Sequence, residues 1–508
     1  MEKNERELAE NYRPVSHIVQ IGKLVELAVH SQIYEYFEKN QLFHPHQYGA
    51  IKNHSTATAV IHVHERWLEA SEQNLISASC LLDQTAAYDL LSHKVLEKKL
   101  ELYQFDSISR QWIASYLGGR SQSVQVESKT SDVIKGGDYA IPQGSVLGGL
   151  LHVINCNDLP GCHSEGDAVV FIDDDTDNVA AADIESVREK VQKEAGNSAL
   201  WLKDNQLCVS GQKSKLIVVA TNQLRRSKVP YKISIEIDGK EVHETNSERI
   251  LGVVVSNNFS WKGHVYGEGS NKGLIQKLAQ RVGIIKKLSY RMNKERLRVF
   301  TEGIFYSTLK YCLPVFGNVF GLEKYKETGS RYSAFTQAAN HDLQVLQNKV
   351  NRILLGKWRD ISTEELCLQT KSLSVQQMVA SSTLSMALKI LRTKKPTFLH
   401  SKFNLNQRGT AFLQPMRKSI CRESFVDRAI TLLNMAGASL RCECTEKVSK
   451  KLINEWVKEN IDIKPKPTSK SVRFQQLQQT QNTVIEPVQA EVDNRSRQRQ
   501  ITDFFTRA

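Results

Sequence analysis

The chain has 508 residues, of which 40% are hydrophobic and 24% are charged, so it is not a disordered protein and has enough apolar side chains for two or three globular units. Its formal net charge of +13 favours a polyanionic partner such as nucleic acid. The nine cysteines are scattered without Cys-x-x-Cys spacing, which favours a reducing compartment over a disulfide framework, and no apolar run is long enough to cross a membrane.

The first predicted element is an amphipathic helix over residues 21–36, where apolar side chains recur at helical spacing. A turn over residues 47–56 follows, and Ser55 or Thr56 is suited to cap the next helix. Lys52 lies in this turn. It is either an ordinary solvated group or a donor to phosphate oxygens.

Two apolar runs each end in carboxylates. Residues 75–83 predict a strand that ends at Asp83, and residues 169–172 predict a second, buried strand. Three aspartates follow the second strand: Asp173, Asp174 and Asp175.

Such a run of aspartates is most often a solvated acidic turn. A calcium loop is excluded, because Asn178 and Ile184 occupy the positions where that loop needs Gly and Glu. A two-metal site for phosphoryl transfer needs a further carboxylate from another strand. Asp83 supplies it if the two predicted strands lie side by side.

The segments around these strands are less specific. Polar and apolar residues alternate over 123–126, which predicts a strand. Residues 140–148 predict a Pro/Gly turn at the start of an apolar helix, where the backbone can approach a ligand closely. Residues 273–298 predict a basic helix, which is either a solvated face or a surface that follows nucleic-acid phosphates. Residues 330–460 predict further helices, and from about residue 464 the composition is that of a linker.

Taken in order, the motifs resemble those of reverse transcriptases from non-LTR (LINE-type) retrotransposons, most closely the jockey-like group. The resemblance runs from Asn11 to about Gly321 and more faintly to about Ile461. The motifs that carry it are Asn11-Tyr12-Arg13-Pro14, Gln47-Tyr48-Gly49, His54-Ser55-Thr56, Leu82-Asp83 through Asp89, Tyr116 to Gln122, Pro142 to Gly148, Asn157 to Pro160, Phe171-Ile172-Asp173-Asp174, Lys213-Ser214, Leu251-Gly252-Val253, and Trp261 with His264.

The resemblance implies an α+β fold of the right-hand polymerase type, followed by a helical C-terminal region and a disordered tail. It also implies truncation at the N-terminus relative to the full element polyprotein. The implied divisions are partial fingers at 1–80, a palm with a fingers insertion at 81–265, a helical thumb at 266–360, a helical region at 361–462 and the tail at 463–508.

The implied function is that of an RNA-directed DNA polymerase, which extends a DNA primer 3′-hydroxyl with dNTPs on an RNA template during non-LTR retrotransposition. Asp83, Asp173 and Asp174 would bind two catalytic Mg²⁺ ions, with Mn²⁺ as an alternative metal. A second alignment of the motif selects Asp174 and Asp175 instead.

The resemblance also assigns residues to the substrates. Tyr88 matches an aromatic residue that lies under the sugar and excludes a 2′-hydroxyl group. Gln143 and Gly144 match a segment that touches the template and the incoming nucleotide, and Lys213 matches a basic residue near the phosphates.

Several positions depart from the family pattern. Ala50-Ile51 replaces a usual Phe-Arg, so a triphosphate contact is lost unless Lys52 replaces it. Gly149 and His152 stand where Pro and Phe are usual. These departures leave an alternative function open: a catalytically impaired, nucleic-acid-binding remnant of a retrotransposon.

The C-terminus carries one more motif, Gln-x-x-aliphatic-x-x-aromatic-aromatic, which resembles the peptide that docks on the sliding clamp, proliferating-cell nuclear antigen. A helical turn would place its apolar side chains on one side. The motif implies a nuclear location after cytoplasmic synthesis. Two other interpretations are that the match arises by chance and that the segment forms a terminal helix folded onto the body of the protein. The residues concerned are Gln498, Ile501, Phe504 and Phe505.

Overall fold

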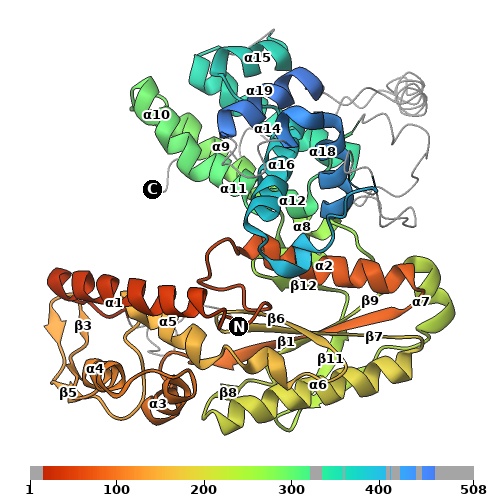
Figure 1. Ribbon diagram of the computed structural model, residues 1–508. Coiled ribbons are helices and arrows are strands. Elements are labelled where there is room, and N and C mark those ends of the chain that lie inside the picture. The colour runs from red at the N-terminus through yellow and green to blue at the C-terminus, as the bar shows by residue number, and fades with distance from the viewer. Residues whose placement is uncertain are drawn as a thin grey trace, which may run out of the picture. The chain divides into compact units, whose positions relative to one another are not determined.

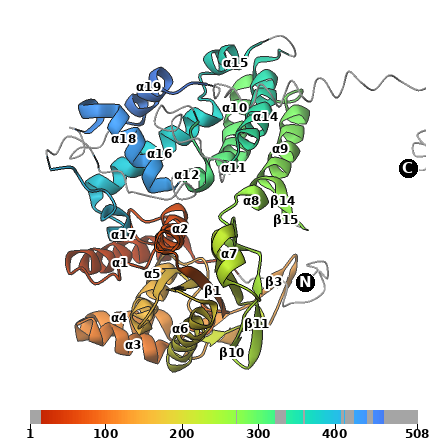
Figure 2. The same ribbon diagram turned by 90° about the vertical axis from the view of Figure 1, so that its right-hand side faces the viewer.

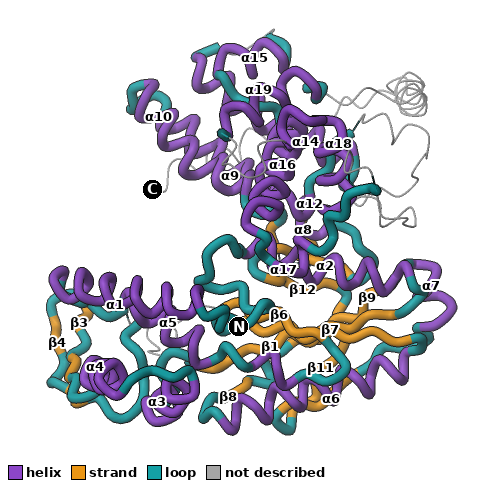
Figure 3. Tube along the Cα trace, in the orientation of Figure 1, coloured by secondary structure: helices purple, strands orange, loops and turns teal. Residues whose placement is uncertain are grey.

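The structure is a computed structural model and describes residues 15–269, 271–320, 335–357, 361–407, 412, 424–441 and 449–463. Within these residues the predicted α+β architecture is confirmed: a sheet with covering helices in the N-terminal half precedes a helical region (Figures 1 and 3). None of the helices in this part of the chain combines the length and apolarity that a membrane span requires.

The central sheet contains both predicted acidic strands. Its strand order is β10-β11-β9-β1-β7-β6, β8 pairs with the end of β1, and all neighbours are antiparallel except β9 and β11. The strands are β1 Ile76–Thr85, β6 Asp167–Phe171, β7 Asp174–Ala181, β8 Cys208–Val209, β9 Lys215–Val219, β10 Ser234–Ile237 and β11 Lys240–Thr245.

The two faces of the sheet carry different helices. Successive side chains of a strand point to opposite faces, so Leu82 and Val179 pack with α6 (Ile184–Asp204) on one face. On the other face the indole N–H of Trp67, in α2 (Thr56–Glu72), donates to Ser79 Oγ at 2.8 Å. In Figure 1 the sheet lies between these two helices. The predicted cap of α2 is confirmed, because the Ser55 and Thr58 side chains form a capping box.

A separate core joins the helices that flank the sheet at the start of the chain. Phe37, Leu96, Ile113 and Leu150 meet in it. These helices are α1 Gln20–Lys39, α3 His93–Leu102, α4 Ser107–Leu117 and α5 Val146–Asn155.

Two sequence expectations need correction here. The predicted first helix forms, but its N-terminal apolar side chains, including Ile21 and Leu24, remain exposed, because α1 packs through its C-terminal half. The single strand predicted over 123–126 is wrong: short paired strands form instead. They are β2 Ser121–Gln122, β3 Gln125–Val126, β4 Lys129–Thr130 and β5 Ile134–Lys135, with β2 pairing with β5 and β3 with β4.

After the sheet, a hairpin leads into the helical region. The hairpin strands are β12 Ser247–Ile250 and β13 Val253–Ser256, and a second short hairpin pairs β14 Gly267–Glu268 with β15 Asn271–Lys272. The helix predicted over 273–298 is divided into α9 and α10. The helices are α8 Lys262–Tyr266, α9 Leu274–Leu288, α10 Lys294–Thr301, α11 Ser307–Lys310, α12 Leu313–Phe316, α14 Gln337–Leu355, α15 Thr363–Thr370, α16 Val375–Thr393, α17 Thr397–His400, α18 Phe425–Arg441 and α19 Lys450–Asn460.

One continuous hydrophobic core extends from α2 into this helical region. Trp67 of α2, Phe316 of α12 and Val457 of α19 all belong to it. Both views place α2 directly beneath the later helices (Figures 1 and 2). Residues far apart in the chain therefore share one core, and α2 is buried between the sheet and the helical region. The described residues also include a 3₁₀ helix at Leu159–Cys162 and a π-helical turn at Glu302–Tyr306.

Candidate functional site

Three of the predicted carboxylates lie together at one end of the sheet. Asp83 of β1 stands directly opposite Asp174 of β7 in the antiparallel ladder. Residues directly opposed in this way have Cβ atoms about 4.5–5.5 Å apart and point to the same face. Asp173 precedes Asp174 in the tight turn between β6 and β7. The Asp83 side chain is 43% exposed, so this cluster is accessible to a cation from solvent.

A lysine lies beside the cluster. Lys213 Nζ is 3.7 Å from Asp83 Oδ2. The loop that carries Lys213 is tied to the same strand, because the Ser210 N–H donates to the Asp83 carbonyl oxygen at 2.9 Å and the Asp83 N–H donates to Ser214 Oγ at 3.4 Å. The structure therefore brings the predicted Lys213-Ser214 turn to the predicted carboxylates.

The turn between β6 and β7 is held by residues 47–49. Ile172 has a φ of +63°, which is unusual for a β-branched residue and needs support from its surroundings. The buried Gln47 side chain gives that support: its Oε1 accepts from the Ile172 N–H at 3.4 Å and from the Gly49 N–H at 2.9 Å. In addition, the Tyr48 N–H donates to the Val170 carbonyl oxygen at 2.7 Å.

Gly49 is required for this close approach. A Cβ at position 49 would lie 2.4 Å from Ile172 Cγ1 and 2.5 Å from the Ile172 nitrogen, which no real Cβ tolerates. The sequence predicts a turn over residues 47–56 but no contact between that turn and the segment of Asp173. The uncommon combination of a buried Gln and a Gly in Gln47-Tyr48-Gly49 was the available signal.

An ion-pair cluster around Asp167 anchors the start of β6 and was missed from the sequence. Asp167 Oδ2 is 2.9 Å from His62 Nε2 and 2.7 Å from Arg66 Nε, and Asp167 Oδ1 is 2.7 Å from His46 Nδ1. The Tyr48 hydroxyl is 2.7 Å from His62 Nδ1. The available signal was the spacing of His62 and Arg66, which are four residues apart and so share a helix face.

The electrostatics of this cluster favour an anionic Asp167. Burial would raise the pKa of Asp167, but the hydrogen bonds from His46 and His62 hold it well below its usual range. Burial lowers the pKa of His62 to about 4. The ligand atoms of these three residues lie within 4.8 Å of one another, a spacing that a metal ion could bridge. Arg66 already neutralises Asp167, so we assign the cluster to structural ion pairing between α2 and β6.

Asp175 lies on the opposite face of the sheet from Asp83. It stands opposite Leu82, faces α6 and is 1% exposed. Burial and the neighbouring Asp177 raise the pKa of Asp175. The geometry therefore favours the alignment that selects Asp173 and Asp174 over the one that selects Asp174 and Asp175.

Tyr88 lies next to the carboxylate cluster and stacks on a buried histidine. The Tyr88 and His152 rings are 5.0 Å apart at an interplanar angle of 15°. Burial, and to a smaller extent the charge of Asp173, raise the pKa of Tyr88. His152 is fully buried, and burial lowers its pKa to about 4, so the imidazole is neutral at pH 7. Tyr88 therefore rests on a neutral, flat aromatic partner.

Gln143 and Gly144 follow the segment that pairs with Tyr88. The Ile141 N–H donates to the Tyr88 carbonyl oxygen at 2.8 Å. Gln143 Nε2 donates to both carboxylate oxygens of Asp89, at 3.1 and 3.2 Å. Gly144 is exposed and has a φ of +98°, a conformation that glycine adopts without strain.

A cavity of about 240 Å³ adjoins the cluster. Asp174, Arg249 and the turn between β12 and β13 line it. Leu251 and Gly252 in that turn have φ values of +45° and +84°, and the Tyr311 hydroxyl donates to the Leu251 carbonyl oxygen at 2.7 Å. The Leu251-Gly252 motif thus forms a fixed turn beside Asp174.

Residues 1–255 match the family model described as reverse transcriptase (RNA-dependent DNA polymerase). The chain belongs to the reverse transcriptase family. It is 24% identical over 361 residues to a probable RNA-directed DNA polymerase from transposon X-element of Drosophila melanogaster, covering 70% of this chain and 36% of the relative. It is 25% identical over 316 residues to the RNA-directed DNA polymerase from mobile element jockey of Drosophila funebris, covering 59% and 33%.

These matches confirm the resemblance of this chain to the jockey-like group. The chain spans about a third of the length of the curated relatives it matches. Among solved structures, it resembles apo telomerase from Candida tropicalis with a TM-score of 0.37 and 10% identity, over 85% of this chain and 61% of that one.

The structure accommodates locally the positions at which this chain departs from its family pattern. Ala50 is exposed and turns the chain with a φ of +53°, and Ile51 is buried. Lys52 Nζ lies 3.6 Å from Glu38 and 4.4 Å from the centroid of the Tyr34 ring, against α1. A Cβ at Gly149 would lie 3.9 Å from the Tyr88 hydroxyl, an ordinary contact. The predicted clamp-binding residues Gln498, Ile501, Phe504 and Phe505 lie outside the described residues.

Proposed function

We propose that this protein is an RNA-directed DNA polymerase that extends a DNA 3′-hydroxyl with dNTPs on an RNA template. The observation that carries the proposal is the position of Asp83 directly opposite Asp174, with Asp173 in the adjoining turn and Lys213 Nζ 3.7 Å from Asp83. Membership of the reverse transcriptase family supports the same activity. The proposed setting is non-LTR retrotransposition, and the naming of the relatives after a transposon and a mobile element supports it.

Divalent metal ions are general in this family, and the donor set fits them. Asp83, Asp173 and Asp174 offer hard carboxylate oxygens, which Mg²⁺ and Mn²⁺ prefer to thiolates or imidazoles. We propose Mg²⁺ as the metal. A bound divalent cation lowers the pKa of the attacking 3′-hydroxyl group and neutralises charge on the leaving pyrophosphate.

The other residues of the site bind and position the substrates in this proposal. Lys213 lies where its ammonium group attracts the triphosphate, and Tyr88 lies under the sugar of the incoming dNTP. Gln143 and Gly144 form the adjoining surface for the template and the nucleotide. Lys52 follows Ala50-Ile51, which stand where the family usually has Phe-Arg, and it is the basic side chain proposed to replace that Arg. To reach a phosphate, Lys52 must break its ion pair with Glu38.

The chemical test uses three aspartate variants. Asp83→Asn and Asp173→Asn remove a metal-binding charge with little change in volume, so we expect primer extension to fall by more than about a hundredfold, or about 3 kcal/mol of barrier. Binding of primer–template, measured by fluorescence anisotropy, should stay within about twofold. Asp175→Asn is the matched control and should retain extension. Activity above a few per cent in Asp173→Asn would overturn its assignment.

We also propose the domain division of a right-hand polymerase: fingers, palm, thumb and a helical C-terminal region. The central sheet is the proposed palm, and the core of α1, α3, α4 and α5 is the proposed fingers. The proposed thumb and C-terminal region share one hydrophobic core, so they are a single packing unit rather than two independent ones.

A second candidate function is a nucleic-acid-binding remnant without turnover. The observation that favours it is Lys52, which pairs with Glu38 instead of standing free for a triphosphate. Extension by the native chain with an RNA template, a DNA primer, Mg²⁺ and dNTPs decides between the two functions. Binding without any extension would select the remnant.

The proposed location is the nucleus, with the sliding clamp as a partner. The support is the sequence pattern of Gln498, Ile501, Phe504 and Phe505 alone. Calorimetric titration of a peptide covering residues 495–508 into the clamp should give saturable binding. A peptide with both phenylalanines changed to alanine should not bind, and equal behaviour of the two peptides would remove this partner.

A further inference from the structure

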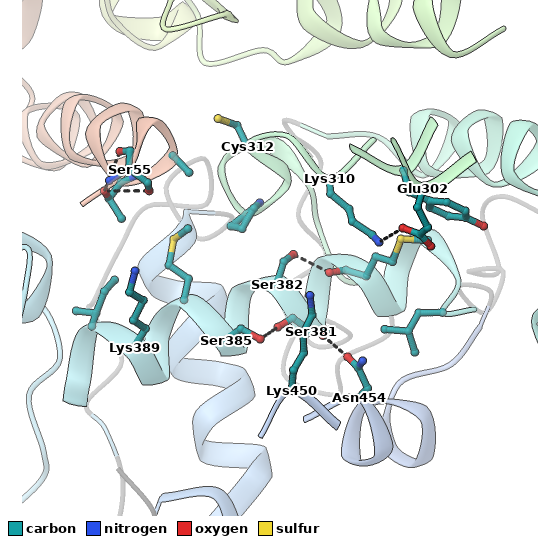
Figure 4. A pocket seen from close by; sticks show the side chains of 18 of the residues that line it. Ser55, Glu302, Lys310, Cys312, Ser381, Ser382, Ser385, Lys389, Lys450 and Asn454 are labelled. Atoms are coloured by element: carbon teal, nitrogen blue, oxygen red, sulfur yellow. Dashed lines mark hydrogen bonds and ion pairs between the residues drawn. The ribbon is translucent and has the colours of Figure 1, made fainter. Parts of the chain in front are cut away.

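A second cavity, of about 500 Å³, lies away from the carboxylate cluster. It is bounded by the N-terminal turn of α2, by α11 and the turn before it, by α16 and by α19 (Figure 4). Its volume falls in the range of about 300–1,000 Å³ that is common for ligand sites. Asp83, Asp173 and Asp174 do not line it.

The lining of this cavity is strongly cationic. Among the described lining residues there are four lysines and one carboxylate, Glu302. Glu302 pairs with Lys310 at 3.2 Å, as Figure 4 shows. The other three lysines, Lys371, Lys389 and Lys450, form no ion pair within the described part of the chain, and all three are exposed. The net excess of positive charge favours an anionic ligand.

A row of serines on α16 adds hydrogen-bond acceptors. The Ser381 hydroxyl donates to Asn454 Oδ1 at 2.6 Å, that of Ser382 to the Met378 carbonyl oxygen at 2.6 Å, and that of Ser385 to the Ser381 carbonyl oxygen at 2.7 Å (Figure 4). The proton of each hydroxyl is therefore engaged, and its oxygen retains lone pairs that can accept. Such oxygens complement a ligand that donates hydrogen bonds.

The cavity also has apolar walls. Tyr306, Met378, Met386 and Ile390 contribute to its lining. Thioether and aliphatic side chains pack against flat aromatic rings without demanding one ring shape. A ligand that satisfies all three features carries negative charge, donor groups and flat apolar rings at the same time.

Single-stranded RNA has these three features together. Its phosphates are anionic, its 2′-hydroxyl and base N–H groups donate, and its unpaired bases are flat rings. DNA lacks the 2′-hydroxyl, and an inorganic phosphate lacks both donor-bearing sugar and base. We propose that this cavity binds unpaired nucleotides of an RNA strand, with phosphates on Lys371, Lys389 and Lys450, riboses against the α16 serines and bases against the apolar walls.

This RNA site is separate from the proposed polymerase chemistry and does not depend on it. The test is therefore a binding measurement on the full chain in EDTA without dNTPs. The probe is a fluorescein-labelled single-stranded RNA of about twelve nucleotides, with DNA of the same sequence as a second probe. Fluorescence anisotropy is recorded over a series of NaCl concentrations.

The test variant is Lys389→Gln/Lys450→Gln. The matched control is Lys203→Gln/Lys240→Gln, which makes the same charge change at exposed lysines outside the cavity. We expect the cavity variant to weaken RNA binding about tenfold and to reduce the slope of log affinity against log salt by about 1.4, since each contact with a single strand contributes about 0.7. The control variant should keep the native slope. Equal losses in both variants would overturn the proposal.

Two further measurements locate the strand and identify its sugar. RNA that contains 4-thiouridine should cross-link to residues 371–390 or 450–454, and Ser385→Phe, which fills the cavity, should abolish these cross-links while the thermal unfolding midpoint is unchanged. A Ser385→Phe protein that unfolds is replaced by Ser385→Leu. Cross-links confined to other segments would overturn the site. Equal affinity of the cavity for RNA and DNA would overturn the assignment to RNA.

Discussion

At the scale of single residues, adjacent side chains with the same chemistry have opposite environments. Asp174 faces Asp83 at the accessible end of the sheet, whereas Asp175, one residue later, is buried against α6. The reason is the two-residue period of a strand, which turns each successive side chain to the other face. Asp173 lies in the turn before β7 and outside this alternation, whereas Asp175 is buried, so Asp175→Asn is a suitable control for Asp173→Asn.

Tyr88 carries the first prediction at this scale. Tyr88→Val should admit ribonucleotides, because in the proposed function the ring occupies the volume that a 2′-hydroxyl group needs. We expect the preference for dNTPs over rNTPs, measured as a ratio of kcat/KM values, to fall at least tenfold.

His152 supplies the control for this prediction. His152→Phe preserves a flat partner for the Tyr88 ring, which lies 5.0 Å away, and should retain the native preference. His152→Ala removes that support and should lower it. An unchanged preference in Tyr88→Val would contradict the role proposed for Tyr88 in sugar selection.

At the scale of elements, the site is an assembly of a strand, a hairpin and a loop. The hairpin of β6 and β7 carries Asp173, and the loop of residues 47–49 holds its turn through the Gln47 side chain. The cluster around Asp167 then connects β6 to α2 through His62 and Arg66. The carboxylates are therefore positioned by an element that contributes no ligand of its own.

Gly49→Ala tests this support. Its Cβ would lie 2.4 Å from Ile172 Cγ1, so the turn that bears Asp173 must shift. Small displacements of a catalytic group cost rate steeply, and we expect extension to fall about tenfold to a hundredfold. Rapid-quench measurement should assign the loss to the chemical step.

Gly196→Ala is the matched control for Gly49→Ala. Gly196 lies in α6, and a Cβ there meets nothing within 4 Å. In a helix this change should stabilise the protein by about 0.5–1 kcal/mol and leave extension unchanged. Equal activity of the two alanine variants would show that the turn of Asp173 does not depend on Gly49.

At the scale of the whole molecule, one core unites α2 with helices formed almost 400 residues later in the chain. His264 of α8 belongs to this buried region, where it is 9% exposed and its ring lies 4.6 Å from that of Phe316. Its Nδ1 accepts a hydrogen bond from the Val254 N–H at 3.3 Å. An acceptor nitrogen must be unprotonated, so the folded state requires neutral His264.

The pH dependence of unfolding follows from this requirement. Burial, then Lys277 and Arg249, lower the pKa of His264 to about 4, against 6.5 in the unfolded chain. Between these values the unfolded chain binds more protons than the folded chain. The contribution of His264 to the free energy of unfolding is therefore fully present above pH 6.5 and declines as the pH falls towards 4. At pH 5 this group has lowered the free energy of unfolding by about 2 kcal/mol.

His264→Gln isolates the contribution, because Gln retains an acceptor and does not titrate. Urea unfolding of both proteins at pH 7.5 and pH 5 gives the change in the free energy of unfolding for each protein. The contributions of the other titrating groups cancel when the two changes are subtracted. We expect the native chain to lose about 2 kcal/mol more than the variant. Parallel pH profiles of the two proteins would contradict a neutral, buried His264.

The sequence by itself determined the family, the two strands that end in carboxylates, the capped start of α2 and the helical C-terminal half. These follow from local patterns, namely apolar periodicity, capping residues and motif order. Tertiary structure alone decided which aspartates share a face, because strand register depends on the partner strand. It alone also joined Gln47 to Ile172 and His62 to Asp167, since those pairs lie 125 and 105 residues apart and no local pattern encodes a contact across such a distance.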